Sequence, residues 1–136
     1  MTLKGVSVES LRAKAVPGKW SAHEQLAHLA RYHQIFLHRI DRILAEQSPE
    51  FSRYRAEDDP EWPAWSGLPT QQVLARLSSM RAKLMARLHS LSEEDFERTG
   101  MHAKFGKMSL SLWLEFFLVH EAHHLYVVFE LVRKIR

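Results

Sequence analysis

The chain has 136 residues, 46% of them hydrophobic and 26% charged, which is the balance of a globular protein, and we expect one domain over residues 1–136. Cysteine is absent, which excludes disulfides, thiolate metal ligands and a cysteine nucleophile. The net charge at pH 7 is only +3, and basic and acidic residues are interleaved, so we expect no nucleic-acid binding.

Neither a secretory signal nor a membrane-spanning run is visible. Residues 1–10 contain charges and no apolar core. The most apolar stretch, residues 110–132, is interrupted by histidines and glutamates. We therefore expect a cytoplasmic protein that makes no contact with a membrane.

A long amphipathic helix is predicted from residue 22 to about residue 46. A short helix around residues 8–15 precedes it, and Ser21 with Glu24 has the pattern of a capping box at its start. Apolar residues recur along it at helical spacing.

Four histidines in this helix are five residues apart, at positions 23, 28, 33 and 38, so they do not share one face. His28 lies among alanines and leucines and is the one expected to point inward. His23, in the first turn, and His33, beside a glutamine, are expected to face solvent. Tyr32, one turn after His28, is a candidate ligand contact.

Residues 49–69 interrupt the helical pattern with four prolines, two tryptophans and an acidic run. A loop of this length is either a functional lid or an aromatic plug over one end of the core, and both alternatives stay open. A second long helix is predicted next, with Thr70 as its N-cap and its end near Ser90.

The last third of the chain contains a helical turn after Ser92, a loop over residues 99–107 and a final helix from Ser109 to about Lys134. No segment has the alternation of a strand, so we predict an all-α protein, an antiparallel helical bundle. Four aromatic residues of the final helix are expected in the core: Trp113, Phe116, Tyr126 and Phe129.

The final helix carries His120 and His124 one turn apart in apolar surroundings. Two imidazoles at this spacing can bind one metal ion. In a chain with nine histidines such a pair also arises readily by chance, so spacing alone is weak evidence. Two histidines that form hydrogen bonds at a bundle seam are the alternative.

Two parts of the chain carry a resemblance to a known family. Residues 17–29 are similar to the P-G-x-W-S-x-x-E-x-L-x-H-L signature of the DinB/YfiT-like superfamily. Residues 100–102, 106–110 and 120–125 resemble the late motifs of the same family, in the same order. Together these motifs extend the resemblance from residue 17 to the C-terminus.

The resemblance implies a four-helix bundle in which three histidines hold a divalent metal. Carried over to this sequence, the ligands are His28, His120 and His124, and His123 is not a ligand. Three protein ligands leave an open coordination position, and the nitrogen donors favour zinc or nickel, with iron and manganese as alternatives. Because few residues precede Pro17, we expect a shortened first helix.

The resemblance also implies a metal-dependent enzyme, either a hydrolase or a transferase of low-molecular-weight thiols, which acts on a small molecule. The alternative is a non-catalytic dimeric bundle whose histidines hold a structural metal or fill the core. A shortened first helix would leave an apolar groove, so we expect a homodimer that covers it.

No general base stands out, and three residues are weak candidates for catalysis. Glu24, one turn before His28, is either a hydrogen-bond partner of that imidazole or only part of the capping box. Glu121 points about 100° away from His120 around the helix and is expected to contact a neighbouring helix or to support a ligand. His102 could reach the mouth of the site.

Overall fold

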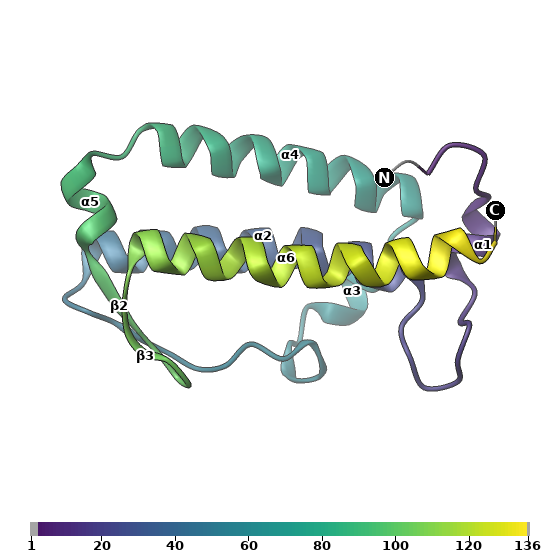
Figure 1. Cartoon of the computed structure of the whole chain (residues 1–136), viewed down its shortest axis with the longest axis horizontal. Coiled ribbons are helices and arrows are strands. Elements are labelled where there is room, and N and C mark those ends of the chain that lie inside the picture. Colours follow the sequence, from purple (N-terminus) through teal and green to yellow (C-terminus); the bar gives the residue numbers. More distant parts are fainter. Residues whose placement is uncertain (1–2, 136) are drawn as a thin grey trace.

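Three long helices make up most of the structure, a computed structural model that describes residues 3–135 (Figure 1). They are α2 (Ala22–Ala45), α4 (Thr70–His89) and α6 (Leu110–Arg133). Helix α2 packs against both of the others. The predicted helical bundle is confirmed.

Each long helix begins at a residue that the local chemistry selects. The capping box at Ser21 is present, with reciprocal hydrogen bonds between Ser21 and Glu24. Ser109 caps α6 by accepting from the N–H of Leu112. The prediction that Thr70 is the N-cap of α4 is wrong, because Thr70 is the first helical residue and its hydroxyl is bound to Nδ1 of His23, 2.8 Å away.

Helices α2 and α4 run in the same direction, and α6 runs in the opposite one, so the predicted antiparallel arrangement holds for α6 against α2 but not for α4 against α2. His23 at the start of α2 contacts Thr70 at the start of α4. Arg98, which follows α4 and the short α5 (Glu93–Glu97), reaches the carbonyl of Ile43 near the end of α2. The long connection between α2 and α4 returns the chain along the bundle to its starting end (Figure 1). It contains the short elements η1 (Ala56–Asp58) and α3 (Trp62–Ser66).

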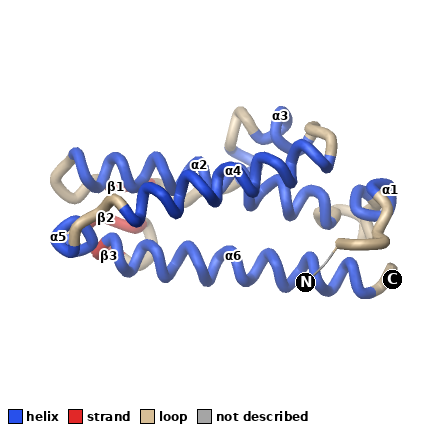
Figure 2. Tube along the Cα trace, turned by 90° about the horizontal axis from the view of Figure 1, so that it is seen from above, coloured by secondary structure: helices blue, strands red, loops and turns tan. Residues whose placement is uncertain are grey.

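The first helix, α1 (Val8–Arg12), is short, as predicted. Figure 2 shows it beside the end of α6, at the end of the bundle where the termini lie. Its residue Leu11 is buried in an apolar cluster with Leu26 of α2 and Val128 and Val132 of α6.

A small sheet closes the opposite end of the bundle, so the prediction that the chain has no strands is wrong. β1 (Glu50–Phe51) pairs in parallel with β2 (Thr99–His102), which pairs antiparallel with β3 (Gly106–Ser109). Strands this short show no alternation, and glycine disfavours strands. Gly100 is required here by close packing, because a Cβ would lie 2.9 Å from the Phe51 ring.

Buried apolar side chains form two clusters along α2. The cluster near the sheet contains Phe36, Trp113 and Phe117, and the cluster near the termini surrounds Leu11. The expectation that Tyr126 and Phe129 lie in the core is wrong, since they are 62% and 49% exposed on the outer side of α6. Among the described residues, no helix has both the length and the apolar run needed to cross a membrane.

Candidate metal centre

Three histidines converge between α2 and α6. One ring nitrogen each of His28, His120 and His124 lies within 4.8 Å of the others. The Nε2 atoms of His28 and His120 are 3.2 Å apart, and the His124 ring centroid is 4.4 Å from that of His28. The structure thus brings together the three residues that the resemblance implied as ligands.

The donor set fits a divalent metal. Tetrahedral zinc with ordinary Zn–N bonds separates its ligand nitrogens by about 3.3 Å, close to the 3.2 Å between His28 and His120. Nδ1 of both rings is buried and has no hydrogen-bond partner in the described part of the chain. In a neutral imidazole whose Nε2 faces an ion, Nδ1 carries the ring hydrogen, so these two atoms lie outside the coordination sphere and the fit rests on the Nε2 spacing.

The three imidazoles are held in the neutral form that binds metals. Burial, together with the neighbouring His124 and His120, lowers the pKa of His28 to about 3. Burial likewise lowers the pKa of His120 to about 3 and that of His124 to about 4, with smaller contributions from neighbouring histidines. All three rings therefore offer lone pairs at neutral pH.

Gln25 orients the third histidine. Nδ1 of His124 donates to Oε1 of Gln25, 2.6 Å away, which leaves the lone pair on Nε2. Gln25 is buried on α2, three residues before His28, so both side chains share one face of the helix. Gln25 is not among the site residues predicted from the sequence, although its i, i+3 spacing to His28 is a signal that points to it.

Aromatic rings enclose the histidines. Measured between ring centroids, Trp20 lies 5.1 Å from His28, and it stacks on Trp62. The Tyr54 ring lies 5.8 Å from that of His28. The Tyr32 ring lies 4.0 Å from that of His120. Tyr54 and Trp62 belong to the proline-rich segment of residues 49–69. This segment therefore lies along the site, which favours the lid or binding-segment alternative over a plug of the core.

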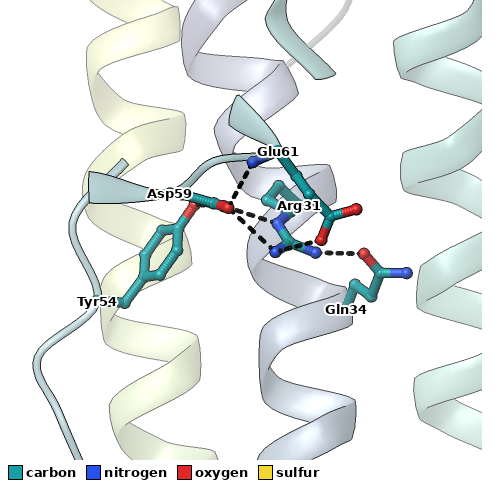
Figure 3. Close-up of polar contacts among 5 residues, drawn as sticks. All are labelled: Arg31, Gln34, Tyr54, Asp59 and Glu61. Atoms are coloured by element: carbon teal, nitrogen blue, oxygen red, sulfur yellow. Dashed lines mark hydrogen bonds and ion pairs between the residues drawn. The ribbon is translucent and has the colours of Figure 1, made fainter. Parts of the chain in front are cut away.

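A buried ion pair fastens that segment to α2 (Figure 3). Nε and Nη2 of Arg31 donate to the two carboxylate oxygens of Asp59 at 2.8 and 3.2 Å. The same carboxylate accepts from the Tyr54 hydroxyl at 2.7 Å. Burial favours the neutral carboxyl, but the hydrogen bonds from Arg31 and Tyr54 outweigh it and lower the pKa of Asp59 to about 2. The ion pair thus holds Tyr54 against the histidines.

A cavity of about 920 Å³ opens beside the three histidines, which line it together with His102. The prediction that His102 reaches the mouth of the site agrees with this position. Nδ1 of His102 accepts from the backbone N–H groups of Lys104 and Phe105. Its hydrogen is therefore on Nε2.

The two candidate glutamates are engaged elsewhere. The Glu24 carboxylate accepts from the N–H of Ser21 and lies 3.5 Å from Nζ of Lys14. Glu121 forms an ion pair with Arg81 of α4, which is the helix–helix contact that the sequence suggested. Neither carboxylate makes a hydrogen bond to His28, His120 or His124 among the described residues.

The expectation that His23 and His33 face solvent is wrong, since both are fully buried. His23 binds Thr70 and the carbonyl of Ser66, both at 2.8 Å. Nδ1 of His33 donates to the Leu29 carbonyl at 2.8 Å, and its Nε2 accepts from Arg81 at 3.1 Å. Partners from α3 and α4 make this burial possible, and they are far away in the sequence.

Comparison with known proteins places the chain in a family, because the family model of the DinB superfamily matches residues 1–128. The chain belongs to the DinB superfamily. This DinB-superfamily protein is 30% identical over 145 residues to YuaE of Bacillus subtilis (98% of this chain, 90% of YuaE). It is 29% identical over 107 residues to a Bacillus cereus protein named "Putative metal-dependent hydrolase", of which it spans 61%, less than two thirds, with 79% of its own length.

A solved structure has the same fold. YfiT from Bacillus subtilis, described as a probable metal-dependent hydrolase with an unusual four-helix bundle topology, superposes with a TM-score of 0.78. The match covers 95% of this chain and 74% of YfiT at 22% identity. The predicted four-helix bundle of the DinB/YfiT type, with a shortened first helix, is thereby confirmed.

Proposed function

We propose that this DinB-superfamily protein is a metal-dependent hydrolase of small molecules, with His28, His120 and His124 as the metal ligands. The observation that carries the proposal is the convergence of three neutral ring nitrogens within 4.8 Å of one another at the edge of a large cavity. The names of the Bacillus cereus relative and of YfiT support the same reaction class.

Zinc or nickel is the metal that we propose, because imidazole nitrogens suit both. A divalent ion with three neutral ligands and an open position supplies a strong Lewis acid that lowers the pKa of a bound water or thiol. Residues around the centre orient the ligands and limit the access of water. Gln25 orients His124, and Trp20, Tyr54 and Trp62 shield the histidines from bulk water.

Transfer of a low-molecular-weight thiol is the second candidate. The chain has no cysteine, so the thiol would be a cosubstrate. The cavity of about 920 Å³ lies near the upper end of the range for small-molecule sites, which leaves space for two small reactants. Assays with and without an added thiol separate the two reactions.

Elemental analysis of the purified protein tests the metal centre. We expect about one zinc or nickel ion per chain, lost in His28→Ala, His120→Ala and His124→Ala. His38→Ala is the matched control, because His38 is an exposed residue of the same helix. Unchanged metal content in all three ligand variants would refute the ligand assignment. Bound metal with no hydrolysis or thiol transfer would favour the non-catalytic bundle.

A further inference from the structure

We propose that the cavity beside the histidines binds an anionic substrate whose carboxylate pairs with Arg39. The substrate class is a small carboxylate with an apolar or aromatic body. This inference rests on the proposed function only for the reaction; the carboxylate site itself is argued from Arg39 and its surroundings.

Arg39 is placed to share the cavity with the metal ligands. It follows His28 by 11 residues on α2, which is about three full turns, so both side chains leave the helix on the same face. Both residues line the cavity of about 920 Å³. Arg39 is also close enough to His120 and His102 to help lower the pKa of each ring, after the larger effect of burial.

Arg39 is a buried guanidinium without a carboxylate. Arg39 is only 7% exposed. No carboxylate of residues 3–135 lies within ion-pair distance of its guanidinium. Nη2 donates to the Ser52 carbonyl at 3.1 Å, and the guanidinium lies over the rings of Phe51 and Trp113 at 5.4 Å. The Arg39 side chain also interacts with the Tyr32 hydroxyl. A guanidinium has five N–H donors, more than these neutral partners occupy.

Arg31, the other buried arginine of α2, differs from Arg39 in having a carboxylate partner. Arg31 is equally buried on the same helix, at 8% exposure, and it forms a two-pronged pair with Asp59. Buried charges in proteins are normally paired in this way. Residues 3–135 supply a carboxylate for Arg31 but none for Arg39, so we assign the partner of Arg39 to a bound anion.

The walls of the cavity fit the same ligand. Arg53, Arg55 and Lys104 also line it, whereas Glu57 is the one carboxylate among its described lining residues, and Glu57 lies 3.8 Å from Arg55. Three aromatic residues line the same cavity: Tyr54, Phe105 and Phe116. An anion with an apolar body therefore finds positive charge at Arg39 and aromatic ring surfaces in the cavity that the histidines line.

Titration of the metal-stripped protein with benzoate tests the proposal, and benzamide serves as the neutral analogue. We expect benzoate to bind, benzamide to bind at least about tenfold more weakly, and Arg39→Gln to weaken benzoate at least about tenfold, as for a hydrogen-bonded charge pair. Arg87→Gln is the control, because Arg87 is a partly exposed arginine of α4 that pairs with Asp41. Equal binding of benzoate and benzamide, or a folded Arg39→Gln variant that binds benzoate like the unmodified protein, would overturn the proposal.

A second measurement needs no destabilising variant. The Nε–Hε signal of Arg39 in the unmodified protein, assigned by its loss in Arg39→Lys, is expected to shift as benzoate is added. Saturable benzoate binding that leaves this signal unmoved would place the carboxylate elsewhere and overturn the proposal. Because no metal is present in either titration, a failure here leaves the metal centre standing, and failure of the metal analysis leaves this test standing.

Discussion

Gln25 of α2 holds Nδ1 of His124 of α6 at 2.6 Å, across the seam where the two helices meet. The contact directs Nε2 of His124 toward His28 and His120. Hydrogen bonds of this kind orient the imidazoles of metal centres, and their removal typically costs 10–100-fold in metal affinity.

We therefore expect Gln25→Ala to weaken zinc binding by about 10–100-fold while the three ligands stay in place. Competition with a chromophoric chelator measures the affinity. Gln72→Ala, at an exposed position of α4, is the control and should bind zinc like the unmodified protein. Unchanged affinity in Gln25→Ala would show that His124 needs no such support.

Asp59→Asn is expected to destabilise the fold by about 2 kcal/mol, because it removes the buried carboxylate that pairs with Arg31 and leaves only the exposed carboxylate of Glu61, 2.9 Å from Nη2 of Arg31. Urea unfolding at pH 7 measures the change. The neighbouring Asp58 is exposed and pairs weakly with Arg55, so Asp58→Asn should cost little. Limited proteolysis should also cut residues 52–61 faster in Asp59→Asn only; equal cutting in both variants would contradict the role given to the ion pair.

The burial of His33 should make the free energy of unfolding depend on pH. Its Nδ1 donates to Leu29 and its Nε2 accepts from Arg81, and burial lowers its pKa below the ordinary value of 6.5. The unfolded chain then binds the proton first, so the stability that His33 contributes is present above pH 6.5 and is lost as the pH falls below it.

The measurement compares metal-free protein with His33→Asn by urea unfolding between pH 8 and pH 5. The other histidines titrate in both proteins, so the difference between the two free energies of unfolding isolates His33. We expect this difference to shrink as the pH falls through 6.5. A difference independent of pH would mean that His33 is not held neutral.

The homodimer remains a proposal with its own test. The outer side of α6 exposes Leu112, Val119 and Tyr126 at seven-residue spacing, and Val119 is 67% exposed. If a second copy covers this side, light scattering should give a dimer that Val119→Glu converts to a monomer. Val16→Glu, at an exposed valine outside α6, is the control. A stable monomer of the unmodified protein at micromolar concentration would exclude the dimer.

What the sequence could predict depended on how local the signal was. The caps at Ser21 and Ser109 involve residues three positions away, so both are visible in the sequence. The one-turn spacing of His120 and His124 is equally local, but it took the family motif to add His28, which lies 92 residues from His120.

The wrong predictions for His23 and His33 arise because their hydrogen-bond partners lie far away in the sequence. Nothing near His23 or His33 indicates that Thr70 and Arg81 satisfy their ring nitrogens, so burial of these polar residues could not be foreseen. Arg39 could not be predicted as a site residue because its role depends on the absence of a carboxylate partner. Only the structure shows that Arg39, unlike Arg31, is buried with no carboxylate of the described residues within ion-pair distance.

The wide separation of the three histidines has a mechanical consequence. An ion held by His28 and His120 would tie α2 to α6 and close a loop of roughly 90 residues. Such a crosslink restrains the unfolded chain more than a contact between neighbours would. Loading the centre should therefore slow hydrogen exchange in the amides of both helices, far beyond the residues that touch the ion.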